Sequence, residues 1–162
     1  MGTSKSCLAF SLILFSLLLS TTGHEYVNEI LTAHNCVRGS LGLKPLKYNF
    51  KLEAYAKSYA KKRQHDCELE HSEGPYGENL FWASPFGYYN YSDAIKIWAD
   101  EKKFYNYGTN CCTNNEMCGH YTQVVWANTK TVGCANVKCD NGDQFLTCNY
   151  EPPGNYEGER PY

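Results

Sequence analysis

The chain has 162 residues, of which 43% are hydrophobic and 20% are charged, and its formal net charge is −2. This acidic balance argues against nucleic acid or an anionic membrane as the primary partner, because both attract proteins with a basic excess. The length suits one domain that buries a substantial core, and we expect that domain to be a monomer.

Residues 1–23 have the pattern of a secretory signal peptide that is cleaved after Gly23. Lys5 supplies a short positive region, Leu8 to Leu19 is almost entirely apolar, and small residues follow. At about 1.5 Å per residue this apolar run is too short for a bilayer core of about 30 Å, which disfavours a retained membrane anchor. No later segment is long and apolar enough to span a membrane. We therefore expect a secreted protein.

Apolar residues recur at helical spacing in the first two-thirds of the chain. Their period predicts one helix over Glu25 to Arg38 and a second from about Phe50 to Asp66. Ser92 or Asp93 can cap a third helix that carries Trp98. Tyr121 and Trp126, further along the chain, are interpreted as core aromatics.

Two strands are predicted near the C-terminus, at about Val132 to Cys139 and Gln144 to Asn149. The segment between them, Asp140-Asn141-Gly142-Asp143, is a strong hairpin turn signal. Helices and strands are both present without regular alternation, so the expected fold class is α+β.

Cysteine usage points to an oxidising compartment. Eight cysteines remain after the leader is removed, and an even number in a secreted chain indicates a disulfide framework. A zinc site is disfavoured because no Cys-x-x-Cys pair is present. The sequence alone leaves the pairing open. The eight are Cys36, Cys67, Cys111, Cys112, Cys118, Cys134, Cys139 and Cys148.

Four segments, in this order, carry a family resemblance. His34 to Arg38 reads H-N-C-V-R, Gly77 to Leu80 reads G-E-N-L, Gly119 to Trp126 reads G-H-Y-T-Q-V-V-W, and Phe145 to Tyr156 reads F-L-T-C-N-Y-E-P-P-G-N-Y. Together they resemble the CAP superfamily of cysteine-rich secretory, antigen 5 and pathogenesis-related class 1 proteins, and most closely its plant class 1 branch. The resemblance implies an α-β-α sandwich stabilised by disulfides.

The resemblance also implies three disulfides, which are Cys67–Cys134, Cys111 or Cys112 with Cys118, and Cys139–Cys148. Cys36 and the doubled Cys111-Cys112 depart from the family pattern. We infer that Cys36 pairs with one cysteine of the doublet, and take Cys112–Cys118 and Cys36–Cys111 as the expected arrangement.

The candidate site consists of His71, Glu78, Glu101 and His120, which match the family's pocket of two histidines and two glutamates. Imidazole and carboxylate groups suit a divalent metal such as zinc, and a carboxylate beside imidazole raises the pKa of the ring. The same residues can instead form purely structural hydrogen bonds. A metal-dependent hydrolase is a minor alternative, because Ser72 lacks the Gly-x-Ser-x-Gly setting of a nucleophile.

For function, the resemblance implies plant defence through binding of a sterol or fatty acid. Apolar candidates for such a surface are Phe81, Trp82, Phe86, Tyr88, Tyr89 and Tyr91. No sterol-contact residue is assigned, because the family's proposed caveolin-like motif has no clean match here. His34 and Asn79 are interpreted as structural.

The C-terminal segment, Pro152 to Tyr162, matches the tail from which plant class 1 members release a signalling peptide. Cleavage would follow Glu151, which leaves residues 24–151 as the domain and implies a receptor for the peptide. Its proline, glycine and terminal position predict a mobile, protease-accessible tail, although a tail that wraps the domain is the alternative. Asn90-Tyr91-Ser92 is the sole glycosylation acceptor. We expect the extracellular apoplast rather than the vacuole.

Overall fold

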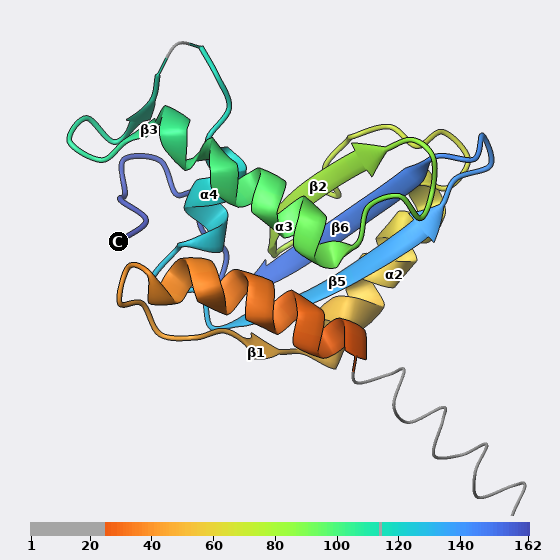
Figure 1. Cartoon of the computed structure of the whole chain (residues 1–162), viewed down its shortest axis with the longest axis horizontal. Coiled ribbons are helices and arrows are strands. Elements are labelled where there is room, and N and C mark those ends of the chain that lie inside the picture. The colour runs from red at the N-terminus through yellow and green to blue at the C-terminus, as the bar shows by residue number, and fades with distance from the viewer. Residues whose placement is uncertain (1–24, 114) are drawn as a thin grey trace, which may run out of the picture.

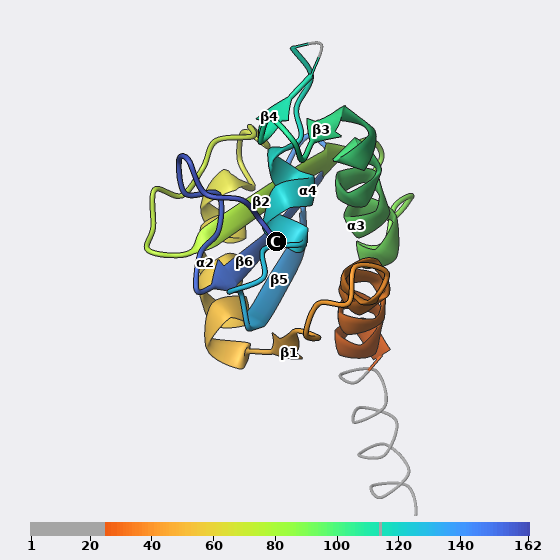
Figure 2. The same ribbon diagram turned by 90° about the vertical axis from the view of Figure 1, so that its left-hand side faces the viewer.

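The computed structural model describes residues 25–113 and 115–162. The predicted leader and its cleavage after Gly23 lie outside the described residues. Within the described ranges, no helix is long and apolar enough to cross a bilayer. The chain folds into three layers, with a sheet between α2 on one side and the remaining helices on the other (Figures 1 and 2). The expected α+β class and α-β-α sandwich are confirmed.

The central sheet has the strand order β1-β5-β6-β2. Its strands are β1 (Lys47–Tyr48), β2 (Gly77–Ala83), β5 (Thr131–Lys138) and β6 (Gln144–Glu151). β5 and β6 form the predicted antiparallel hairpin, and Gly142 adopts a φ of 92° in its turn. β2 pairs antiparallel with β6, whereas β1 runs parallel to β5 at the opposite edge.

Helix α2 (Phe50–Arg63) covers one face of the sheet and packs against β5 and β6. Its first turn lies so close to β5 that a Cβ at Gly133 would stand 2.3 Å from the backbone nitrogen of Glu53. The other face carries the N-terminal helix of residues 25–39, α3 (Tyr91–Asp100) and α4 (Gly119–Val124). A 3-10 turn (Glu101–Phe104) and a small ribbon of β3 (Tyr105–Asn106) and β4 (Cys111–Cys112) follow α3.

The alternation of side chains along the strands divides the core between the two faces. Leu80, Ala135 and Phe145 pack beneath α2 with Ala56 and Ala60. The next residues along the same strands face the other helices, and this larger cluster includes Phe81, Cys134, Leu146, Trp98, Tyr121 and Tyr150.

The helix boundaries differ from the predicted ones at two ends. α3 is capped by Asn90 rather than by Ser92 or Asp93, because Asn90 and Asp93 form a reciprocal capping box with two 2.9 Å hydrogen bonds. α2 ends at Arg63 instead of Asp66, and Cys67 takes a positive φ of 60°.

Of the three disulfides that the resemblance implies, Cys112–Cys118 is present, whereas Cys67–Cys134 and Cys139–Cys148 are wrong. Cys134 and Cys148 lie directly opposite each other in the β5–β6 register, with their Cα atoms 4.1 Å apart, and they pair across the sheet. Cys139 therefore lies beyond the ladder, where the end of β5 meets the end of α2, and it pairs with Cys67. The three bonds are Cys67–Cys139, Cys112–Cys118 and Cys134–Cys148.

The expected Cys36–Cys111 bond is also wrong. Both thiols are free and exposed. Cys36 lies on the N-terminal helix and Cys111 on β4, and both views place these elements at opposite ends of the molecule (Figures 1 and 2). The two cysteines therefore do not form the expected bond in this structure.

Candidate functional site

The two predicted histidines and two predicted glutamates form two separate hydrogen-bonded pairs. His71 Nδ1 donates to Glu78 Oε1 at 2.8 Å, and His120 Nδ1 donates to Glu101 Oε1 at 2.6 Å. His71, Glu78 and His120 line one hollow of about 400 Å³, which Asn79 and the Cys112–Cys118 loop also border. Glu101 does not line this hollow, and it contacts His120 from the 3-10 turn that follows α3. We call this hollow the His/Glu groove.

Glu78 anchors the first pair from β2. Its side chain is only 5% exposed, whereas that of His71 is 54% exposed. Burial favours a higher pKa for Glu78, but hydrogen bonds from His71, Ser72 and Asn149 outweigh it and lower the pKa below its usual value. The hydrogen bond to Glu78 in turn raises the pKa of His71. The pair is therefore a charge-assisted one.

Glu101 anchors the second pair at the beginning of α4. Its other oxygen accepts the backbone N–H groups of His120, at 3.1 Å, and Tyr121, at 3.3 Å. On the far side, Asn79 Nδ2 donates to the carbonyl of His120 at 3.1 Å. The ring of His120 also stacks on Trp98, with centroids 6.0 Å apart. Both the backbone and the ring of His120 are thus fixed.

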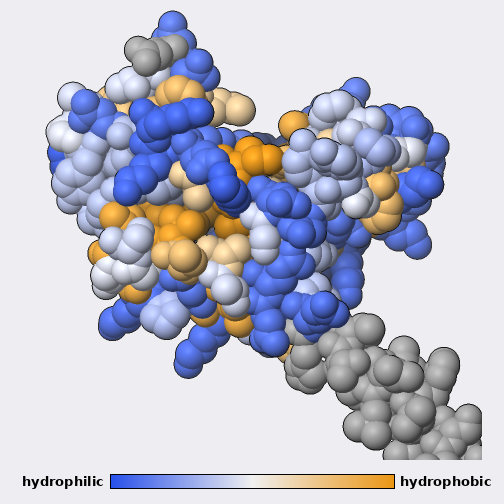
Figure 3. Space-filling view, in the orientation of Figure 1, coloured by the Kyte–Doolittle hydropathy of each residue, from blue (hydrophilic) through white to orange (hydrophobic). Residues whose placement is uncertain are grey.

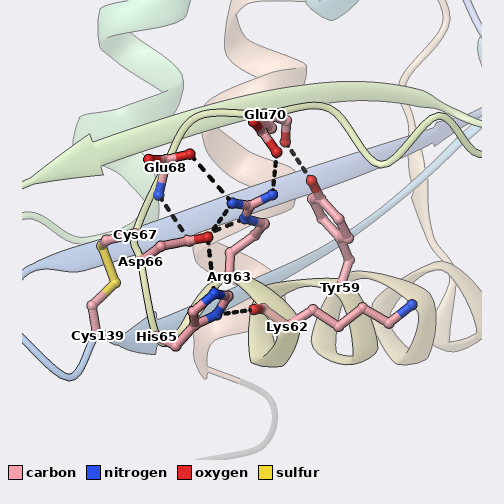
Figure 4. A network of polar contacts seen from close by, with 9 residues as sticks. All are labelled: Tyr59, Lys62, Arg63, His65, Asp66, Cys67, Glu68, Glu70 and Cys139. Atoms are coloured by element: carbon pink, nitrogen blue, oxygen red, sulfur yellow. Dashed lines mark hydrogen bonds and ion pairs between the residues drawn. A yellow bond between two sulfur atoms is a disulfide. The ribbon is translucent and has the colours of Figure 1, made fainter.

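The loop that carries His71 is held by an ion network at the end of α2 (Figure 4). Arg63 reaches Asp66, Glu68 and Glu70 on this loop. Tyr59 donates to the Glu70 carbonyl at 2.5 Å. The neighbouring Cys67–Cys139 bond ties the same loop to the hairpin. Sequence reasoning missed this network, because charged residues of this kind are common on protein surfaces. Only the end of α2 at Arg63 brings them together.

Both rings keep a nitrogen available for a ligand. Among the described residues, no hydrogen bond engages Nε2 of His71 or His120, while each Nδ1 is oriented by a carboxylate. A metal-binding histidine commonly shows this arrangement, in which the carboxylate fixes the tautomer and increases the basicity of the ring. In residues 25–113 and 115–162, however, no three His, Cys, Asp or Glu side chains gather as a preformed metal cage. His71 and His120 are therefore the two imidazole groups that line the groove, each with its Nδ1 held by a carboxylate.

The C-terminal tail packs on α4 beside the His/Glu groove, so the expectation of a mobile tail is wrong. Asn155 Nδ2 donates to the Gly119 carbonyl at 2.8 Å, and Thr122 donates to Asn155 Oδ1 at 2.7 Å. Gly154 donates its N–H to Gln123 at 2.9 Å. Asn155 also lines the His/Glu groove. Composition alone predicted mobility because the partners of the tail lie far away in sequence.

The end of the tail is equally well held. Ala127 donates its N–H to the Pro161 carbonyl at 2.6 Å, and Pro161 is buried. Tyr162 shares a 3.0 Å hydrogen bond with the Tyr121 hydroxyl and stacks on Tyr107. The residue before the expected cleavage point, Glu151, belongs to β6, and its carbonyl accepts the Lys130 N–H. A protease must therefore open this part of the chain first.

The candidate lipid surface separates into buried and exposed rings. Phe81 is buried, and Tyr89 packs against it with ring centroids 5.5 Å apart. Trp82, Phe86 and Tyr88 are exposed, at 46%, 42% and 73%. Asn90, the predicted glycosylation acceptor, is exposed beside them and caps α3.

Residues 31–150 match the model of the cysteine-rich secretory protein family, called CAP. The chain belongs to this family. It is similar to pathogenesis-related protein PR-1 of Medicago truncatula, with 50% identity covering 94% of this chain and 97% of the relative. It is also 42% identical to pathogenesis-related protein 1 of Arabidopsis thaliana, covering 99% of this chain and 98% of the relative. The expected kinship with plant pathogenesis-related class 1 proteins is confirmed.

Solved CAP structures share the fold. The crystal structure of NaASP2 with Zn²⁺ matches with a TM-score of 0.70 and 26% identity, covering 85% of each chain. Schistosoma mansoni venom allergen-like protein 4 matches with a TM-score of 0.67 and 31% identity, covering 85% of this chain and 94% of that one. The first of these relatives was solved with zinc.

Proposed function

We propose that this CAP protein is a secreted plant defence protein that captures sterols or related lipids on the aromatic segment that runs from the end of β2 to the start of α3. The observation that carries this proposal is the exposure of three large rings within seven residues, Trp82, Phe86 and Tyr88. Exposed apolar groups gathered on one segment commonly mark an interaction site. A sterol is mostly hydrocarbon and needs such a surface with few polar anchors.

The segment is held rigidly while its rings face solvent. Phe86 donates its N–H to the Gly142 carbonyl at 3.0 Å, and Trp82 Nε1 donates to Asp143 at 3.2 Å. These bonds attach the segment to the β5–β6 turn. A preorganised surface loses little conformational entropy when it binds a ligand, which favours affinity.

Sterol binding is tested with the oxidised chain and labelled sterol competed by unlabelled plant and fungal sterols. We expect saturable binding that Phe86→Ser and Tyr88→Ser each weaken. Leu69→Ser is the matched control, because Leu69 is 55% exposed on a different loop. Equal binding by all three variants would remove the aromatic segment from the proposal, and no competable binding at all would remove sterol capture.

A second candidate function is zinc binding in the His/Glu groove, favoured by the two carboxylate-oriented rings. His71 and His120 would hold the ion through Nε2, and Glu78 and Glu101 would orient them. A zinc ion there would act as a Lewis acid, or it would cross-link α4 to the loop between α2 and β2 that carries His71. His120→Ala should abolish the zinc uptake that calorimetry detects. Two protein ligands predict weaker binding than a four-ligand structural site gives.

We assign binding rather than hydrolysis to the groove. Ser72 is adjacent to His71 in sequence, but its hydroxyl accepts a 3.1 Å hydrogen bond from Tyr55 instead of meeting an imidazole. A nucleophilic serine needs a general base within hydrogen-bond reach. Metal-dependent turnover of a peptide panel, lost in His71→Ala, would overturn this assignment.

Release of residues 152–162 as a defence signal to a receptor is a further part of the proposal. The match of the tail to the class 1 pattern supports it. Release requires that the hydrogen bonds between the tail and α4 are broken first. Incubation of the intact protein with secreted plant fluid should yield the Pro152 to Tyr162 fragment in a mass spectrum. If only fragments with other ends form, the signalling role fails while lipid binding stands.

A further inference from the structure

A trough lined by lysines follows the edge of the sheet opposite to the His/Glu groove. One hollow of about 510 Å³ lies between residues 44–47 and 127–131, and it is bordered by Lys44, Lys47 and Lys130. A second hollow shares Lys47 with the first and adds Lys51 and Phe50. Both follow β1, the edge strand at the bottom of Figures 1 and 2. We call the two hollows together the lysine trough.

The positive charge of the trough is not neutralised within the protein. No carboxylate lines the first hollow, and Glu151 is the one carboxylate that lines the second. Among the described residues, none of the four lysines has an ion-pair partner, although the chain as a whole is acidic. Four lysines and one carboxylate therefore line the trough, and an anionic ligand would meet little competition.

A buried arginine fixes both walls of the trough. Arg38, which is fully buried, donates to the Lys44 carbonyl at 2.9 Å and to the Thr129 carbonyl at 3.3 Å. Lys47 donates its N–H to the Lys130 carbonyl at 3.0 Å, so two of the lysines lie on backbone segments that are hydrogen-bonded to each other. The backbone that carries these lysines is thus set before a ligand arrives, so only their side chains have to be ordered on binding.

Aromatic rings border the second hollow. Phe50 is 66% exposed, packs edge-on against Tyr48 at 5.2 Å, and lies in the same hollow as Tyr76. An exposed ring of this kind offers an apolar face for the C–H side of a sugar ring. Lysines and rings therefore line the second hollow together.

We propose that the lysine trough binds a linear acidic polysaccharide, a chain of sugar rings that carry carboxylates. The lysines are spread over two hollows instead of converging on one point, which fits charges repeated along a polymer rather than a single phosphate. They line hollows rather than a protruding surface, which fits a chain better than a flat membrane. Disulfide-bonded proteins belong to compartments outside the cytosol, where carboxylated polysaccharides are the common polyanions and nucleic acids are not.

The probe is a series of oligogalacturonates of increasing length, titrated into the oxidised full-length domain. We expect affinity to increase with length and to fall with salt, while neutral cello-oligosaccharides of equal length do not bind. The triple variant Lys44→Gln/Lys47→Gln/Lys130→Gln should bind about tenfold more weakly, the scale expected for losing three exposed charge contacts. Phe50→Ala should weaken binding without changing its salt dependence.

The matched control is Lys61→Gln/Lys62→Gln/Lys138→Gln, which removes the same charge from exposed positions outside the trough. Equal weakening by both triple variants would show uniform attraction and overturn the site. Full competition by inorganic phosphate would reduce it to a single-anion site. Stronger binding to phosphatidylserine vesicles or single-stranded DNA than to the oligogalacturonates would assign the trough to another partner. The sterol test above does not depend on any of these outcomes.

Discussion

The carboxylate of Glu101 holds both the ring and the backbone of His120. One carboxylate oxygen accepts a hydrogen bond from Nδ1 of His120 at 2.6 Å. The other accepts one from the backbone N–H of the same residue at 3.1 Å. A single carboxylate thereby sets the start of α4 and the direction of the ring. The Nε2 atom, which the zinc proposal uses, depends on this contact for its orientation.

The first prediction concerns that contact. Glu101→Gln retains the shape of the side chain but removes its charge, and it should weaken zinc binding by about 10- to 100-fold, as loss of an orienting carboxylate commonly does. Calorimetry on the oxidised protein measures the change. Glu116→Gln is the matched control, because Glu116 lines the same groove. An unchanged zinc affinity in Glu101→Gln would show that the pair has only a structural role.

The second prediction is that pH acts on stability and zinc binding in opposite directions through His71. The hydrogen bond to Glu78 raises the pKa of His71 above its usual 6.5. Its contribution to stability is therefore fully present below pH 6.5 and is lost as pH rises through the raised value. Zinc binds the neutral ring, so zinc affinity should increase over the same range.

The measurements are thermal unfolding and zinc titration between about pH 5 and 8, the range in which histidine changes charge. His71→Gln should flatten both pH profiles. Glu78 adds a separate loss of stability at acid pH, because its pKa is lowered in the folded protein. This contribution is present above pH 4.5 and is lost as pH falls through the lowered value. A profile that keeps its neutral-pH limb in His71→Gln would assign that limb to another group.

The third prediction ranks the disulfides. Cys67–Cys139 spans 72 residues and Cys112–Cys118 spans 6. Loop-closure entropy then predicts that removing the long bridge by a double serine substitution costs about 4 kcal/mol, and removing the short one about 2 kcal/mol. Chemical denaturation gives these values. A non-reducing peptide map that joins Cys67 to Cys134 would contradict the structural assignment.

The fourth prediction concerns the docked tail. Asn155→Ala removes both side-chain hydrogen bonds to α4 and should make local opening easier by about 1–2 kcal/mol. Hydrogen exchange at the Gly154 amide should accelerate, and protease cleavage near Glu151 should become faster. Glu157→Ala is the control, because Glu157 is exposed and its side chain makes no hydrogen bond or ion pair with any described residue. Equal exchange rates in both variants would mean that other contacts hold the tail.

The fifth prediction separates the glycan at Asn90 from the cap. Ser92→Ala removes the acceptor motif but leaves the capping box intact, so it should eliminate the glycan mass with little change in stability. Asn90→Ala removes both and should cost about 1 kcal/mol. Mass spectrometry and thermal unfolding of protein secreted from plant cells distinguish the two effects. An unmodified Asn90 in that material would refute glycosylation.

The sequence predicted elements wherever the signal was local. The Asp140 to Asp143 turn and the flanking alternation gave the β5–β6 hairpin, and helical periodicity gave the N-terminal helix, α2 and α3. The family resemblance also singled out the four residues that form the two His–Glu pairs. Their pairing, His71 with Glu78 and His120 with Glu101, needed the fold, because Glu101 and His120 belong to different elements.

The wrong predictions share a physical cause, which is dependence on register or on distant partners. The Cys139–Cys148 staple looked reasonable for a hairpin, but the register places Cys134 opposite Cys148. The tail has the composition of a mobile segment, yet Thr122 and Ala127 supply its hydrogen bonds from other parts of the chain. β2 and α4 were not predicted either, because α4 has only six residues and β2 depends on its pairing with β6.

All three disulfides close loops within residues 67–148. The N-terminal helix and the tail lie outside every loop, and hydrogen bonds and packing alone retain them. We therefore expect reduction to act on the cross-linked centre, whereas local opening of the tail leaves every one of these bonds intact. Loss of the tail would leave these cross-links in place, although Thr122 and Gln123 of α4, and Ala127 after it, would lose the hydrogen bonds that they make with the tail.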